Sequence, residues 1–136
     1  MKLISTLALL IFPLGAAAEG IDLTVSGVRS DVGQALVAVF DSAQAFDRLD
    51  FEKVAGFAAL PAQRGSLAHH FTGLNAGPYA IFLFHDENSD EDLNVRGWTL
   101  LEGIGASGAD APGDEPSFAE AAFAPGPVTV KLHYGQ

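Results

Sequence analysis

The stretch from Tyr79 to Asp92 places the strongest constraint on how this chain can fold. Six consecutive apolar residues, Tyr79 to Phe84, are followed directly by His85. Alternate side chains of a strand point to opposite faces, so a strand here is apolar on both faces and must be covered on both sides. Five carboxylates then fall within the seven positions from Asp86 to Asp92. The sequence therefore predicts a central buried strand that ends in a loop rich in oxygen ligands.

The other regular stretches are typical of strands joined by turns. Ile21 to Ser26 alternates apolar and polar residues, and Gln34 to Phe40 is almost wholly apolar. Because the residues between them have turn chemistry, these two stretches are predicted to pair as a β-hairpin. Further strands are predicted at 54–60, 67–71 and 127–134. This pattern indicates an all-β fold.

A turn motif ahead of the central strand narrows the fold class. Leu74, Gly77 and Tyr79 form a Leu-x-x-Gly-x-Tyr pattern, which resembles a turn of small prealbumin-like and immunoglobulin-like sandwiches. Tyr79 is expected to bury its ring while its hydroxyl reaches a backbone partner. Cap residues near Ser42 and a capping box at Ser117 indicate short helices. We predict a single antiparallel β-sandwich of about seven strands, with one or two short helices.

The first eighteen residues have the organisation of a secretory signal peptide. Lys2 is followed by an apolar segment from Leu3 to Leu14, and small residues then end at Ala18. Cleavage is expected after Ala18, which leaves residues 19–136 as a single β-sandwich domain in the periplasm or outside the cell. The chain has no cysteine, so its stability must come from packing, with or without an ion, and not from disulfides.

The charge and the motifs exclude several classes of function. The formal net charge is −10 at pH 7, which disfavours nucleic acids and anionic membrane surfaces as partners and favours cations. The segment around Ser107 lacks the spacing of a nucleophile elbow, and neither a nucleophilic cysteine nor a phosphate-binding loop is present. Because these catalytic motifs are absent, we lean towards a protein that is not an enzyme. We also expect no membrane insertion after signal cleavage.

Several motifs occur in an order that resembles a known family. They include His85-Asp86-x-Asn88, Leu93, Glu102-Gly103-x-Gly105-x-Ser107 and Pro116-Ser117-Phe118-x-x-Ala121-Ala122-Phe123. The chain resembles the small secreted bacterial proteins grouped as domain of unknown function family 2141. This resemblance covers nearly all of the chain after the signal peptide and implies an exported β-sandwich without an established activity. The chain departs from the family pattern at Asp90-Glu91, where the family reads Asn-Gly, and at Asn94, where the family has Asp.

The acidic turn has the spacing of a calcium loop on a β-scaffold. Oxygen-bearing residues alternate along it, and calcium prefers six to eight oxygen ligands. The loop is not an EF-hand, because Glu91 stands where that loop needs glycine and a strand precedes it. Distant acids such as Glu102, Asp110 or Asp114 would complete the site. The predicted metal ligands are Asp86, Asn88, Asp90, Asp92 and Glu102.

Two other interpretations of the turn remain open at this point. The acids can simply form a solvated tip that keeps the end of the strand soluble, or His85 can join them around a transition metal. We predict a binding or structural module whose acidic loop is stabilised by Ca²⁺, with His85 and Trp98 as ligand-binding residues. Its expected partner is a cell-envelope protein, a peptide or a carbohydrate, and the chain is expected to be a monomer or weak oligomer. The alternative is a small periplasmic hydrolase that uses His85 with Asp86 and Glu102.

Overall fold

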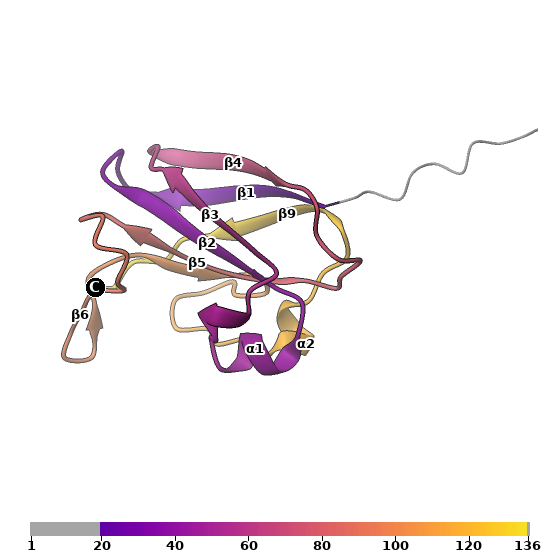
Figure 1. Cartoon of the computed structure of the whole chain (residues 1–136). Helices are drawn as coiled ribbons and strands as arrows, with labels where there is room; N and C mark the ends of the chain where they lie inside the picture. Colours follow the sequence, from indigo (N-terminus) through magenta and orange to yellow (C-terminus); the bar gives the residue numbers. More distant parts are fainter. Residues whose placement is uncertain (1–19, 136) are drawn as a thin grey trace, which may run out of the picture.

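The computed structural model describes residues 20–135, so the predicted signal peptide lies outside the described residues. Nine strands and short helical segments follow one another along this part of the chain (Figure 1). In order they are β1 (Ile21–Val28), β2 (Gln34–Phe40), α1 (Ala43–Asp47), the 3-10 turn η1 (Phe51–Lys53), β3 (Gly56–Pro61), β4 (Gly65–Phe71), β5 (Ala80–Asp86), β6 (Val95–Arg96), β7 (Thr99–Leu100), β8 (Ile104–Ala106), α2 (Phe118–Ala121) and β9 (Gly126–Lys131). Within residues 20–135, none of the helices has the length and apolar character needed to cross a membrane.

Seven of these strands form two stacked sheets, which confirms the predicted all-β sandwich. One sheet has the strand order β4-β1-β9 and the other has the order β3-β2-β5-β8. All neighbours are antiparallel except β1 and β9, which run parallel. The remaining two strands, β6 and β7, form a small separate hairpin. In Figure 1 the helices α1 and α2 lie below the strands of both sheets.

The predicted hairpin between β1 and β2 is wrong. β1 pairs with β4 and β9, whereas β2 pairs with β3 and β5 in the other sheet. The reason is burial: β1 is buried on one face only, while β2 is buried on both. A strand that needs cover on both faces belongs in a sheet that has a second layer on each side. The connection at 29–33 therefore crosses from one sheet to the other.

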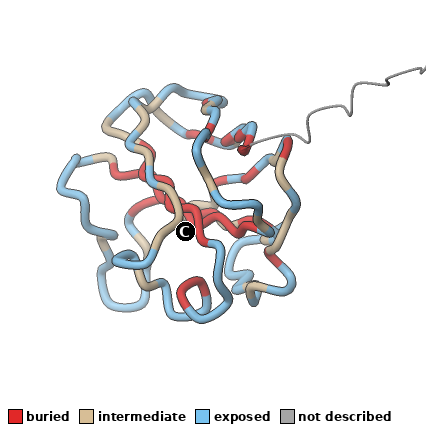
Figure 2. Tube along the Cα trace, turned by 45° about the vertical axis from the view of Figure 1, so that its right-hand side comes forward, coloured by how far each residue is buried: buried red, intermediate tan, exposed pale blue. Residues whose placement is uncertain are grey.

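The hydrophobic residues form two layers, one on each face of the four-stranded sheet. The inner layer lies between the sheets, and the outer layer lies beneath α1 and α2. Figure 2 shows the buried segments running through the middle of the molecule, with exposed loops around them. Each fully buried aliphatic or aromatic side chain contributes about 1.5–3 kcal/mol to stability. From β5, Ile81 and Leu83 join the inner layer, while Phe82 and Phe84 join the outer layer.

Local features around β5 match what the sequence predicts. The hydroxyl of Tyr79 donates to the backbone carbonyl of Asn75, so the buried ring is anchored at the corner. Ser42 caps α1, and Ser117 with Glu120 forms the predicted capping box of α2. Ser107 extends the pairing beside β5, because its hydroxyl accepts from the backbone N–H of Ile81 at 2.9 Å. With β2 on one side and β8 on the other, β5 is an interior strand of its sheet, and Asp86 is its last residue.

Gly33 lets the 29–33 connection approach the beginning of the acidic loop. Its φ is +74°, in the left-handed region, and an added Cβ would overlap the carbonyl oxygen of Asp86 and lie 2.7 Å from the Cα of Glu87. Only glycine tolerates both the conformation and the close approach.

We therefore expect Gly33→Ala to lower the free energy of unfolding by more than the ~1–2 kcal/mol that a left-handed backbone alone costs. Gly73→Ala is the matched control, because Gly73 has φ +71° and open space where the Cβ would lie. Chemical denaturation of both variants measures the difference. Equal losses in the two variants would contradict the close approach.

Candidate functional site

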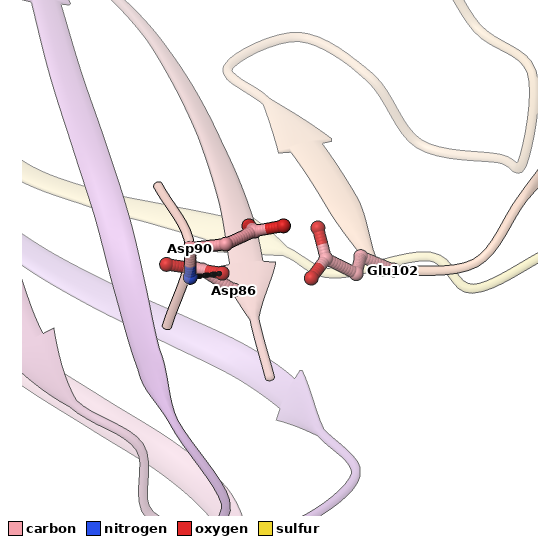
Figure 3. Close-up of side chains that lie close together, drawn as sticks. All are labelled: Asp86, Asp90 and Glu102. Carbon is pink, nitrogen blue, oxygen red and sulfur yellow. Dashed lines mark hydrogen bonds between the residues drawn. The ribbon is translucent and has the colours of Figure 1, made fainter. Parts of the chain in front are cut away.

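Three carboxylates come together at the end of β5. Oxygen atoms of Asp86, Asp90 and Glu102 all lie within 4.8 Å of one another. Asp86 is the last residue of β5, Asp90 lies in the loop that follows, and Glu102 lies just before β8. Figure 3 shows the carboxylate of Glu102 facing those of Asp86 and Asp90. We call these three residues the acidic triad.

Two members of the triad are removed from solvent. The exposed fraction is 0% for Asp86 and 4% for Glu102, whereas Asp90 is exposed. The idea of a solvated tip is therefore wrong for Asp86. Burying a carboxylate is costly unless it is hydrogen bonded, paired or bound to a metal.

The loop after β5 is folded around Asp86. The Asp86 carboxylate accepts hydrogen bonds from the side chain of Gln34 at 3.0 Å and from the backbone N–H groups of Asp90 and Glu91 at 3.2 and 2.9 Å. Gln34 stands opposite Asp86 in the β2–β5 pairing. Ser89 and Glu91 adopt left-handed φ values of +56° and +64°. The loop thus accepts two unfavourable backbone conformations while it wraps around the carboxylate.

Asn94 links the other two members of the triad. Its backbone N–H donates to Glu102 Oε2 at 3.1 Å, and its Nδ2 donates to Asp90 Oδ2 at 2.9 Å. The remaining polar atom, Asn94 Oδ1, is buried and has no hydrogen-bond partner in the protein. An orphaned buried acceptor is unusual and points to a missing partner. Asn94 is not among the metal ligands predicted from the sequence, although the departure from the family's Asp marked this position.

Burial and hydrogen bonding shift the pKa values of two members of the triad, Glu102 and Asp90. Burial raises the pKa of Glu102, the Asn94 N–H opposes this shift, and the nearby Asp86 and Asp90 carboxylates raise the pKa further. The pKa of Asp90 is lowered, chiefly by the hydrogen bond from Asn94 and then by the backbone N–H of Asp92. Among the described residues, no lysine or arginine forms an ion pair with the triad. The cluster therefore lacks a compensating protein cation.

Arg29 instead anchors the beginning of the acidic loop. Its guanidinium forms an ion pair with Glu87, donates to the carbonyl of Leu101 at 3.2 Å and lies 4.4 Å from the ring centroid of Tyr134. The hydrogen bond from Arg29 lowers the pKa of Glu87. Arg29 thus ties the loop to the residue before Glu102, which holds the two sides of the triad together.

His85 lies on the inner face of β5 and is fully buried. Its Nε2 lies 2.7 Å from the carbonyl oxygen of Val32, which can only accept, so Nε2 carries the proton. Its Nδ1 lies 2.9 Å from the hydroxyl of Tyr134 and accepts from it. That hydroxyl oxygen in turn accepts from the backbone N–H of Arg29 at 3.0 Å. Both ring nitrogens of His85 are thus engaged by protein partners, and its predicted binding and hydrolytic roles gain no support from this geometry.

The other predicted site residues lie outside the triad. Asn88 and Asp92 are exposed, and each bonds to Asp90: Asn88 Nδ2 donates to its Oδ2 at 3.0 Å, and the Asp92 N–H donates to its Oδ1 at 3.0 Å. The side chain of Asp114 accepts from the backbone of Asp110, at a separate turn. Trp98 is fully exposed in the turn between β6 and β7. The structure thus brings three of the five predicted metal ligands within 4.8 Å of one another, and the side chain of Asn88 contacts one of these three.

The fold and the triad define the class of this protein. It is a small all-β sandwich with a cluster of three carboxylates, two of them buried, at the end of its central strand. Residues 23–131 match a family model described as an uncharacterized protein conserved in bacteria, DUF2141. The chain belongs to this family, which confirms the resemblance seen in its motifs. Comparison with curated proteins and with solved structures gives no significant match.

The raised pKa of Glu102 gives a pH-dependent expectation for the protein in chelator. A carboxyl whose folded-state pKa is raised contributes stability below its unfolded pKa, near 4.5, and this stability is lost as the pH rises through the folded pKa. Glu102→Gln removes that loss and keeps an oxygen that can accept from Asn94. We expect the variant to become more stable than the wild type as the pH rises from 4 to 7.

Urea denaturation at each pH measures this difference. Glu115→Gln is a suitable comparison, because Glu115 is exposed and lies outside the triad. A wild type that gains stability relative to Glu102→Gln as the pH rises, still in chelator, would contradict the electrostatic account of the triad.

Proposed function

We propose that this protein is an exported binding or structural module whose acidic loop is held by a calcium ion bound to Asp86, Asp90, Glu102 and Asn94. The observation that carries the proposal is the buried, unpartnered Oδ1 of Asn94 beside three carboxylates that lack a cation. Asn94 already bonds to Asp90 and Glu102 through its two nitrogens. A calcium ion bound by this Oδ1 together with the triad would give the oxygen a partner and would offset two of the three negative charges.

The spacing of the carboxylates fits a single ion of this kind. Calcium binds oxygen atoms at 2.3–2.6 Å, so two ligands of the same ion lie at most about 5 Å apart. The triad oxygens lie within 4.8 Å of one another. Calcium also takes six to eight ligands in flexible arrangements, which suits a loop that supplies some of them and leaves others to water. Magnesium demands a stricter octahedron at shorter distances and is the weaker candidate.

The chemistry of the donors supports calcium over a transition metal. The candidate ligands are carboxylate and amide oxygens, which hard cations prefer. The nearest imidazole in sequence, that of His85, uses Nε2 on Val32 and Nδ1 on Tyr134. Zinc and copper usually need such a nitrogen or a thiolate, and the chain has no cysteine.

Export is part of the same proposal. The signal-like sequence up to Ala18 is the support for it. Calcium sites of extracellular modules have dissociation constants of about 10⁻⁴–10⁻³ M, weaker than those of intracellular sensors. Because the triad has only three carboxylates and one of them is exposed, we expect a dissociation constant in this weak range and not in the nanomolar range of calcium-buffer proteins.

We expect calcium to raise the melting temperature of the protein from Glu19 to Gln136. A ligand that binds only the folded state stabilises it by about 1.4 kcal/mol at ten times its dissociation constant, which millimolar calcium reaches for a dissociation constant of about 10⁻⁴ M. In a domain of this size that corresponds to roughly 5 °C. Calorimetry in chelator and then in millimolar calcium measures the shift, and magnesium at the same concentration should produce a smaller one.

The variants Asp90→Asn and Asp92→Asn separate an ion site from a general charge effect. Both replace an aspartate of the same loop and remove one charge, but only Asp90 belongs to the triad. Asp90→Asn and Glu102→Gln should abolish most of the calcium shift, while Asp92→Asn should keep it. No shift in the wild type, or equal losses in Asp90→Asn and Asp92→Asn, would refute the proposed site.

A further inference from the structure

The outer face of the four-stranded sheet is only partly covered. The helices α1 and α2 pack on one part of it, and two adjoining hollows of about 530 Å³ each open on the rest. Leu49, Phe82 and Leu93 line both hollows, so the two form one continuous feature. We call it the outer groove. Each hollow lies within the range of about 300–1,000 Å³ that is usual for small-molecule sites.

The groove gathers apolar side chains that a folded chain normally hides. Its floor comes from alternate residues of β2 and β5: Leu36, Ala38, Phe82 and Phe84. Eight large hydrophobic residues are exposed in the described part of the chain, and four of them line the groove: Leu49, Phe51, Phe57 and Leu93. An exposed apolar patch in a hollow marks a site of interaction more often than a single exposed side chain does.

The polar residues of the groove are mostly acidic. In the hollow beside the acidic loop, Glu91 and Asp92 are the only residues that are not apolar. The polar residues that line the other hollow are Asp47, Asp114, Glu115, Ser117 and His133. Among the described lining residues there is no lysine and no arginine. A cleft lined by charges of one sign over an apolar wall concentrates ligands of the opposite sign.

We propose that the outer groove binds a small cationic amphiphile, an organic ammonium compound with an aliphatic or aromatic body. The ammonium group would lie at Glu91 and Asp92, and the body would lie on the floor formed by β2 and β5. The proposal follows from charge complementarity. A peptide or a sugar needs many hydrogen-bond partners, and the hollow beside the acidic loop offers only the two acids.

This inference rests on the binding role proposed above but not on the calcium site. None of the four proposed calcium ligands lines either hollow. The loop residues Glu91 to Leu93 border the groove, so calcium can adjust one wall without touching the ligand. The two proposals can therefore fail separately.

The test is a titration of the ¹⁵N-labelled protein, in chelator, with decyltrimethylammonium below its micelle concentration. Amide shifts should saturate and should map to residues of β2, β5 and the loop at 91–93. Decanoate, which has a matched chain and the opposite charge, should bind at least tenfold more weakly. Tetramethylammonium, which has no tail, should not saturate. Calcium should leave saturable binding of decyltrimethylammonium in place.

Matched variants distinguish the apolar floor from the acidic rim. Phe57→Ser should weaken binding of decyltrimethylammonium at least fivefold, while Val32→Ser should not, because both side chains are more than half exposed and only Phe57 lines the groove. Glu91→Gln with Asp92→Asn should weaken binding. Asp22→Asn with Asp31→Asn, which removes two charges outside the groove, should not.

Several outcomes would overturn the proposal. These are the absence of saturable binding, equal affinity for decanoate, or amide shifts confined to other surfaces. Loss of binding in Glu102→Gln but not in Phe57→Ser would place the ammonium group at the triad instead. In that case the groove proposal fails while the calcium proposal stands.

Discussion

The structure depends on the burial of β5 on both of its faces. Ile81 and Leu83 pack between the sheets, and Phe82 and Phe84 pack in the outer layer. A strand with apolar side chains on both faces has to lie inside a sheet that is covered on each side. Its last two residues, His85 and Asp86, are therefore buried as well, although both are polar. Each has to find partners inside the protein.

His85 and Asp86 obtain their hydrogen-bond partners in different ways. His85 faces the inner layer, where a carbonyl and a hydroxyl occupy its nitrogens. Asp86 follows Phe84 onto the outer face and gathers backbone N–H groups from its own loop. The same loop brings Asp90 close to Glu102 and leaves negative charge that no lysine or arginine pairs with in the described residues. Local hydrogen bonds thus satisfy the polar atoms of Asp86 but leave the charge of the triad uncompensated, which is the reason for proposing a bound cation there.

Strand positions with period two were well predicted from the sequence. The alternation from Ile21 to Ser26 and the double-sided apolar run from Tyr79 to Phe84 have the burial that they indicate. Strand pairing was predicted less well. The turn between Val28 and Gln34 has the chemistry of a hairpin, yet it joins two sheets. Turn residues determine a local change of chain direction, whereas the strand with which each strand pairs depends on which of its two faces must be buried.

The sequence by itself determined the family, the β-sandwich and the concentration of acids after a buried strand, because these follow from local periodicity and from ordered motifs. Only the tertiary structure decided which acids meet. Asp92 is near Asp90 in sequence but lies outside the triad, whereas Glu102 joins it from beyond the β6–β7 hairpin. Neither the role of Asn94 nor the outer groove could be predicted from the sequence, because an unpartnered oxygen and a hollow are defined by the residues that surround them in the fold. Composition records charges, and only folding determines which charges are buried together.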